Sequence, residues 1–444
     1  MQNTQGHEQP RALLVSIRTP KITDAEAEES LAELKRLVTT LGYQVIGTQS
    51  QRQPSTAGLT VVGAGKLREL ARFTGGKGVV ERGGKHADAD DESVAIPYMA
   101  GVLDELATVV VFDCDLTPSQ MRNVENALGV EVLDRTGVII EIFSRHAKTR
   151  AARLQVEIAR LNYLSPRVRE LGGGKERQSG RGAGETALEL DRRKVRDRLA
   201  ELKRELENVQ QEDGNRRAQR AEQMCVALVG YTNAGKSSAM RALTGSEVLV
   251  EDKLFATLDT TVRAMQPETQ PRVLISDTVG FIKKLPHDLV ASFRSTLEEA
   301  RNASLLLYVV DASDATFRAQ LEVVNEVLRE VGVEGTPQLL LLNKADRLNE
   351  EQKHALLQEF PGAVLMSTRQ PSDIQSLRER IMQFAEGSMV EEEIFVPYTA
   401  NGIVGEIRSK MRIVSESYDG DGVRLRVKAK VADLERLRKL LGVG

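Results

Sequence analysis

The stretch Gly230-Tyr231-Thr232-Asn233-Ala234-Gly235-Lys236-Ser237 decides the fold of this 444-residue chain. It reads G-x-x-x-x-G-K-S, and an apolar run at 224–229 comes directly before it. A strand, a glycine loop and a helix are the context in which this pattern binds phosphate, because backbone N–H groups and the helix N-terminus surround the anion. The spacing predicts that Lys236 reaches the β- and γ-phosphates and that the Ser237 hydroxyl binds Mg²⁺. A glycine-rich turn with an unrelated lysine is the alternative, and the complete spacing argues against it.

Apolar runs and helical patterns alternate over residues 223–386, on both sides of this loop. Continuous apolar runs separated by helices are typical of a parallel sheet with helices on both faces. The expected strands after the loop lie at 273–275, 305–310, 339–342 and 364–366. The fold class of this region is therefore α/β, a P-loop domain with a mostly parallel sheet.

Three further motifs follow these strands, at the sheet edge where α/β folds bind ligands. They are Asp277-Thr278-Val279-Gly280, Asn343-Lys344-Ala345-Asp346 and Ser367-Thr368-Arg369. We expect Asp277 to hold Mg²⁺ through water and the Gly280 N–H to contact the γ-phosphate. Asp346 can accept hydrogen bonds from N1–H and the 2-amino group of guanine, which adenine does not offer. With a backbone N–H of Ser367-Thr368 facing guanine O6, the motifs together predict a GTPase.

Two segments bear on hydrolysis. Leu254-Phe255-Ala256-Thr257-Leu258-Asp259-Thr260-Thr261 lies where the first switch belongs, and one of its threonines should close over Mg²⁺ and the γ-phosphate. Spacing alone does not choose among Thr257, Thr260 and Thr261. Phe281 follows Gly280, at the position where many small GTPases place a glutamine that orients water. We therefore expect slow intrinsic hydrolysis.

Three other regions flank the P-loop domain. Residues 1–137 alternate like an α/β domain, with strands near 12–17, 43–47 and 109–113, helices capped by Asp24 and Thr117, and an exposed insertion near 74–95. Residues 138–222 predict an antiparallel helical hairpin, because apolar residues step by three, four or seven in two stripes. Residues 387–444 predict a small α+β domain with strands at 394–396 and 423–427.

The helical region is basic. Residues 144–222 hold 20 Lys/Arg against 13 Asp/Glu, a net +7, whereas the whole chain carries −3. Its connecting segment, 166–184, is rich in glycine and contains Arg167, Arg169, Lys175, Arg177 and Arg181. Arginines in a flexible, glycine-rich segment between two long helices favour a nucleic-acid backbone as the partner. A solvated connector is the alternative.

Composition excludes several other classes of protein. No apolar run approaches the ~20 residues of a membrane helix, and no basic and apolar leader begins the chain. Cys114 and Cys225 lack metal-ligand spacing. We expect reduced thiols, a cytoplasmic location and a monomer.

With these motifs the chain resembles the HflX family of ribosome-associated GTPases over nearly all of its length. The phosphate loop, Phe255–Asp259 and Asp277–Ile282 are similar to the family's motifs. The segment Leu154-Gln155-Val156-Glu157 with the Gly/Arg loop is the most specific match outside the P-loop domain. Two N-terminal segments also match: Phe112-Asp113-Cys114-Asp115-Leu116-Thr117-Pro118-Ser119-Gln120 and Leu133-Asp134-Arg135-Thr136-Gly137.

The resemblance implies binding to the 50S ribosomal subunit, contact between rRNA and the 166–184 loop, and ribosome splitting or rescue under stress. It implies that Thr257 is the switch threonine that binds Mg²⁺ with Ser237, and that Lys236, Thr257 and Gly280 serve catalysis. Ser367-Thr368 departs from the more usual Ser-Ala, and the 74–95 insertion lengthens the N-terminal domain. Whether a K⁺ ion binds at Asn233 is not decided by the sequence. Two other hypotheses for the function also stay open: a GTPase that acts on another RNA, and a switch that recruits a protein.

Overall fold

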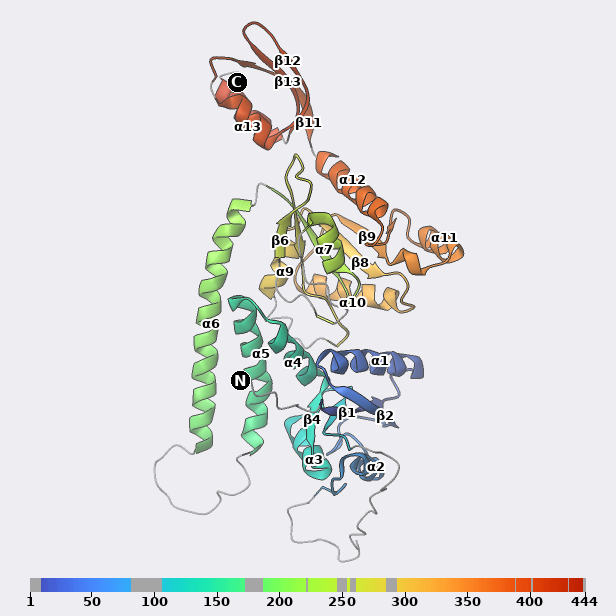
Figure 1. The fold of residues 1–444 in the computed structure, drawn as a ribbon. Helices are drawn as coiled ribbons and strands as arrows, with labels where there is room; N and C mark the ends of the chain where they lie inside the picture. Colours follow the sequence, from blue (N-terminus) through green and yellow to red (C-terminus); the bar gives the residue numbers. More distant parts are fainter. Residues whose placement is uncertain are drawn as a thin grey trace, which may run out of the picture. The chain divides into compact units, whose positions relative to one another are not determined.

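The structure, a computed structural model, describes residues 9–80, 106–171, 187–220, 223–245, 254–255, 261–284, 294–387, 389–400, 402–429 and 431–441. The chain divides into two compact units. The first covers residues through Glu207, and the second begins at Asn208. The first unit therefore holds the N-terminal domain and most of the helical region, and the second holds the P-loop and C-terminal domains (Figure 1).

The N-terminal domain is a four-stranded parallel sheet in the order β2-β1-β3-β4. Helices cover both faces of this sheet: α1 packs with α4, and α2 packs with α3. Thr117 caps α3 as predicted, whereas α1 is capped by Thr23, one residue before the predicted Asp24. The sequence prediction missed β4, and helix α4 lies across the domain boundary expected at residue 137. The elements are β1 (Arg11–Arg18), α1 (Asp24–Thr40), β2 (Gln44–Arg52), α2 (Ala64–Thr74), β3 (Val109–Phe112), α3 (Pro118–Leu128), β4 (Glu131–Asp134) and α4 (Arg135–His146).

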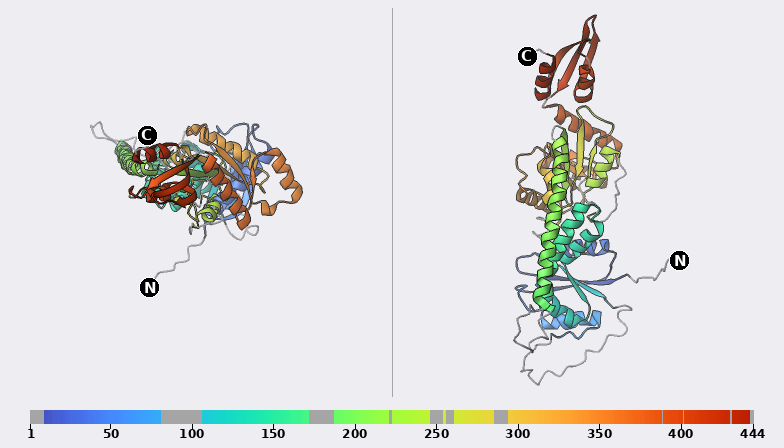
Figure 2. Two further views of the ribbon diagram at one scale, coloured as in Figure 1. Left: turned by 90° about the horizontal axis from the view of Figure 1, so that it is seen from above. Right: turned by 90° about the vertical axis from the view of Figure 1, so that its left-hand side faces the viewer.

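The helical hairpin consists of α5 (Arg150–Leu171) and α6 (Ala187–Arg220). Two ion pairs fix the antiparallel register, Arg150–Glu205 at 3.3 Å and Glu157–Arg198 at 3.0 Å. Leu154, Ile158 and Leu202 of the two predicted stripes are buried. Figures 1 and 2 show the two helices side by side.

The connecting segment starts later than predicted. Helix α5 continues through Pro166 to Leu171, so Arg167 and Arg169 belong to the helix. Lys175, Arg177 and Arg181 lie outside the described residues, as does most of the predicted 74–95 insertion.

Arg167 has a structural partner, contrary to its predicted part in reading phosphates. Its guanidinium pairs with the buried Asp134 carboxylate at 2.9 Å, donates to the Leu116 carbonyl at 3.2 Å, and stacks 3.4 Å from the Tyr163 ring centre. The Tyr163 hydroxyl donates to the same carboxylate at 2.7 Å. These contacts attach α5 to the end of β4. Arg167 therefore anchors the hairpin to the N-terminal domain.

The P-loop domain is a six-stranded sheet in the order β10-β9-β8-β5-β7-β6. All neighbours are parallel except β6, a short antiparallel edge strand that the sequence prediction missed. Along β8, Leu307 and Val309 face the core under α7 and α12, and Val310 faces the core under α10 and α11. Helices therefore cover both faces, as predicted. The elements are β5 (Met224–Gly230), α7 (Lys236–Thr244), β6 (Thr261–Ala264), β7 (Val273–Asp277), α9 (Arg294–Arg301), β8 (Leu305–Asp311), α10 (Phe317–Glu330), β9 (Gln338–Asn343), η1 (Ala345–Arg347), α11 (Glu350–Glu359), β10 (Val364–Leu365) and α12 (Pro371–Gly387).

The C-terminal domain is an antiparallel sheet in the order β11-β13-β12 with two helices. The two predicted strands are confirmed as parts of β11 and β13, but β12 between them was missed because its residues are largely polar and exposed. The segment Asp419-Gly420-Asp421 joins β12 to β13. The elements are β11 (Val390–Pro397), α13 (Ile403–Lys410), β12 (Arg412–Tyr418), β13 (Gly422–Ala429) and α14 (Val431–Leu441). None of the helices in the described residues combines the length and apolar character that a bilayer crossing requires.

Candidate nucleotide-binding site

Two glycines fix the path of the phosphate loop between β5 and α7. Gly230 has a φ of +152°, and a Cβ there would lie 2.2 Å from the Val309 carbonyl oxygen. Gly235 has a φ of +102°, and its Cβ would lie 2.1 Å from Asn343 Nδ2. Any side chain would collide with the neighbouring strands β8 and β9. The motif thus needs glycine at both positions to seat the loop at the edge of the sheet.

Lys236 is buried at the start of α7. Its ammonium group donates to the carbonyl oxygens of Gly230 at 3.0 Å and Tyr231 at 2.8 Å. Burial lowers the pKa of Lys236 to about 8, and the nearby Asp277 carboxylate partly opposes that shift. A phosphate group beside this ammonium would replace the solvation that burial removes.

Ser237 and Asp277 meet at the sheet edge. The Ser237 hydroxyl donates to Asp277 Oδ2 at 2.8 Å, and Asp277 is fully buried at the end of β7. The next hydroxyl, on Thr278, donates to the Leu228 carbonyl at 2.7 Å, which fixes the chain after β7 to β5. A hydroxyl beside a carboxylate supplies the hard oxygen ligands that Mg²⁺ prefers. The residues present therefore fit this ion.

The segment after Asp277 lies along the phosphate loop. The Phe281 N–H donates to the Gly230 carbonyl at 3.2 Å, and the Thr232 N–H donates to the Phe281 carbonyl at 2.8 Å. The Lys283 N–H donates to the Tyr231 hydroxyl at 2.7 Å. The Phe281 side chain is only 2% exposed, so it packs into the protein rather than toward a nucleotide.

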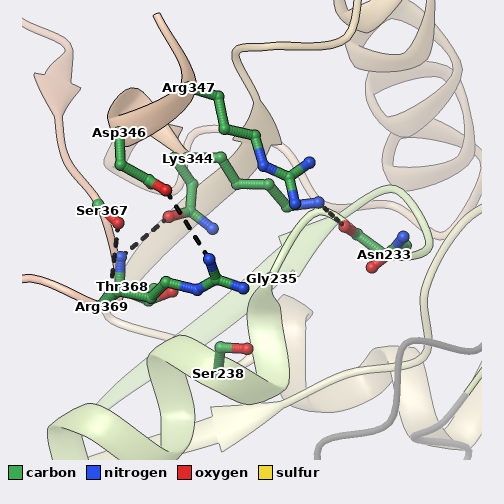
Figure 3. A pocket seen from close by; sticks show the side chains of 10 residues that line it. Asn233, Gly235, Ser238, Lys344, Asp346, Arg347, Ser367, Thr368 and Arg369 are labelled. Atoms are coloured by element: carbon green, nitrogen blue, oxygen red, sulfur yellow. Dashed lines mark hydrogen bonds and ion pairs between the residues drawn. The ribbon is translucent and has the colours of Figure 1, made fainter.

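A pocket of about 290 Å³ opens beside the phosphate loop (Figure 3). Figure 3 places Asp346, Ser367 and Arg369 at one end and Asn233 at the other. The pocket thus gathers residues of the phosphate loop, the Asn343–Asp346 motif and the Ser367–Arg369 motif, three separate parts of the chain. Its lining consists of Asn233, Gly235, Ser238, Asn343, Lys344, Asp346, Arg347, Ser367, Thr368 and Arg369.

Asn343 connects these motifs and is 1% exposed. Its Nδ2 donates to the Ala234 carbonyl at 2.8 Å, and its Oδ1 accepts from the Thr368 N–H at 3.2 Å. The Ser367 N–H donates to Asp373 Oδ2 at 2.8 Å. One N–H of Ser367-Thr368 was predicted to face guanine O6, and here the N–H groups of both residues have protein acceptors. Contact with O6 through Thr368 requires its N–H to leave Asn343.

Asp346 remains ionised at neutral pH. A hydrogen bond from the Ser367 hydroxyl lowers the pKa of this carboxyl, and Arg369 at 4.0 Å adds to the effect. An anion at this end of the pocket suits a ligand with two N–H donors on one edge, as guanine has.

Two residues of the site were not predicted from sequence. Asp311 accepts from Lys344 Nζ at 2.7 Å, and the same ammonium donates to the Asn233 carbonyl at 2.9 Å. Asp373, in the first turn of α12, holds the Ser367 N–H. Asp311 ends β8, so the strand-end rule that found the other motifs could have found it. Nothing in the sequence marks Asp373.

The predicted switch is only partly described. Phe255 is buried with a φ of +58°. Ala256, Thr257, Leu258 and Asp259 lie outside the described residues.

Comparison with known families accounts for most of the chain. A model described as GTP-binding GTPase N-terminal matches residues 28–80 and 96–144, and one described as GTP-binding GTPase Middle Region matches 146–220. A third, described as 50S ribosome-binding GTPase, matches 225–344. Among solved structures, a GTP-binding protein from Sulfolobus solfataricus with GDP is 24% identical, covering 85% of this chain and 99% of that one, with a TM-score of 0.44.

Curated relatives match most of the chain. A GTPase HflX from Gluconacetobacter diazotrophicus is 55% identical over 440 residues, covering 97% of this chain and 98% of the relative. A GTPase HflX from Escherichia coli is 38% identical over 357 residues, covering 78% and 84%. Together with a phosphate loop, a Ser–Asp pair suited to Mg²⁺ and a pocket suited to guanine, these matches mean that the chain hydrolyses GTP and belongs to the HflX family of GTPases.

Proposed function

We propose that the chain binds the large ribosomal subunit and uses GTP hydrolysis in ribosome splitting, rescue or biogenesis, notably under stress, as a monomer in the cytoplasm. The observation that carries this proposal is the match of residues 225–344 to a family described as 50S ribosome-binding GTPase. The net charge of +7 over residues 144–222 supports it, because ribosomal RNA is a polyanion.

We propose the following roles in nucleotide binding. Gly230–Ser237 surround the phosphates, Phe255–Asp259 close over them, and Asp346 reads the guanine edge with the backbone of Ser367–Arg369. Ser237 and Thr257 are proposed to bind Mg²⁺ directly and Asp277 through water. The bound ion neutralises charge on the phosphate oxygens. Lys236 donates to the β- and γ-phosphates, and the Gly280 N–H donates to the γ-phosphate.

Binding to the ribosome is tested by co-sedimentation of the chain, loaded with a non-hydrolysable GTP analogue, with purified 50S subunits. Replacing Arg177 and Arg181 with alanine should weaken this binding and leave GTP affinity intact. Each lost phosphate contact should flatten the log–log salt dependence by about one unit. The matched control is Arg329→Ala with Arg380→Ala, an equal change of charge on exposed residues of α10 and α12.

Three results would oppose the proposal. Equal sedimentation with an unrelated structured RNA would favour a general RNA clamp. A lack of sedimentation with both the 50S subunits and the unrelated RNA would favour a protein partner. If the Arg177/Arg181 variant binds 50S subunits with wild-type affinity and wild-type salt dependence, the Gly/Arg segment only connects the two helices.

Asn233 is the proposed place for a K⁺ ion beside the phosphates. Its side chain is exposed at the pocket while its carbonyl is held by Lys344. Such an ion would add positive charge where charge develops during hydrolysis. Equal hydrolysis rates in NaCl and KCl at matched ionic strength would remove this part of the proposal.

A further inference from the structure

Thr232, the third residue of the phosphate loop, carries a buried hydroxyl that the fold does not use. The residue is 7% exposed, and among the residues that the structure describes its Oγ1 has no hydrogen-bond partner. Other buried threonines of this domain are satisfied: Thr278 donates to Leu228 at 2.7 Å, and Thr244 donates to Met240 at 2.8 Å. Buried polar groups without partners are rare, and they cluster where function needs them.

The methyl group of Thr232, which shares its Cβ with the hydroxyl, lies close to Gly280 and Lys236. A Cβ built on Gly280 would lie 2.9 Å from Thr232 Cγ2 and 3.0 Å from Lys236 Nζ. Thr232 and Lys236 therefore border the same small space next to Gly280. Lysine in this loop and the glycine after β7 are the groups that surround the γ-phosphate in P-loop GTPases. Thr232 thus stands at the γ-phosphate end of the loop.

The residue after Gly280 cannot help the attacking water. Phenylalanine has no polar group, and Phe281 is buried with its backbone bonded to Gly230 and Thr232. A threonine hydroxyl can accept one hydrogen bond and donate another, which is what holding a water against a phosphate oxygen requires.

We propose that the Thr232 hydroxyl orients the attacking water for GTP hydrolysis. Oγ1 accepts a hydrogen bond from the water, whose oxygen forms the new bond to the γ-phosphorus. The bond from that phosphorus to the β,γ-bridging oxygen breaks, and its electron pair stays on GDP. The second proton of the water passes to an oxygen of the departing phosphate, so Thr232 gains and loses no proton.

The test compares Thr232→Val, which removes the hydroxyl and keeps the shape, with Thr232→Ser, which keeps the hydroxyl. The full-length chain is assayed for kcat and KM with GTP, affinity for a fluorescent GDP analogue, and thermal midpoint. Thr232→Val should lower kcat about tenfold or more, with KM and GDP affinity within about twofold of wild type. Thr232→Ser should recover most of that loss. The midpoint of Thr232→Val should be equal or higher, because a methyl replaces an unpartnered polar group.

Thr244→Val is the matched control, since it deletes a buried hydroxyl that has a partner at the far end of α7. It should lower the midpoint and keep turnover. The proposal is overturned if Thr232→Val keeps kcat within twofold of wild type, or if Thr232→Ser is as slow as Thr232→Val. It is also overturned if Thr232→Val loses GDP affinity and midpoint together, which would make the hydroxyl a structural element of the loop.

Discussion

Asn343→Ala should separate the phosphate loop from the guanine motif. The wild-type side chain makes two hydrogen bonds, to the Ala234 carbonyl at 2.8 Å and from the Thr368 N–H at 3.2 Å, and is almost completely buried. Each bond contributes about 1 kcal/mol, and leaving its buried partner unsatisfied adds to the loss, so the P-loop domain should lose about 2–4 kcal/mol. For a domain of this size the thermal midpoint falls by about 2–4 °C per kcal/mol.

The assay is a thermal scan with and without GDP. The unfolding transition whose midpoint GDP raises belongs to the P-loop domain, because the ligand stabilises the domain that binds it. GDP affinity should fall as well, since Asn343 positions loops at both ends of the pocket. Asn349→Ala makes the same chemical change in the same domain, where Asn349 only caps α11. It should cost about 1 kcal/mol and leave GDP affinity unchanged. Equal midpoints in the two variants, or wild-type GDP affinity in Asn343→Ala, would refute the reasoning.

Two other predictions concern charge in the site. Asp346→Asn should weaken GTP binding and favour xanthosine triphosphate, because the 2-oxo group of xanthine accepts a hydrogen bond from an amide. Competition of each nucleotide against a fluorescent nucleotide measures this preference. An unchanged preference for GTP would contradict the prediction. The folded pKa of Lys236, about 8, is below its ordinary value of 10.5. The nucleotide-free fold therefore binds fewer protons at this residue than the unfolded chain between these values, and its stability should rise over that pH range, by about 3 kcal/mol in full. Lys236→Met should lack this rise, and parallel pH profiles of thermal midpoint in the two proteins would argue against it.

The local motifs of this chain could be predicted from sequence because each performs its chemistry within a few residues. The phosphate loop needs glycine at 230 and 235 and lysine at 236, whatever lies elsewhere in the chain. The central strands of the P-loop domain were also found, because strands buried on both faces read as continuous apolar runs. Strands β4, β6 and β12 were missed, because they are short edge strands or largely exposed and carry no such pattern.

Pairings between distant residues were decided by the tertiary structure alone. Asn343 reaches Ala234 across 109 positions of sequence, and Arg167 reaches Asp134 across 33. Composition suggested that Arg167 reads phosphates, yet the fold brings it to the buried Asp134 carboxylate, whose charge would be costly to leave without a partner. The Thr232 hydroxyl is the opposite case: the motif allows any residue at this position, and only the structure shows that the hydroxyl is buried with no hydrogen-bond partner among the described residues. Sequence determines which groups a loop carries, whereas the fold determines which of them are already bonded, because burial makes each hydrogen bond depend on residues far along the chain.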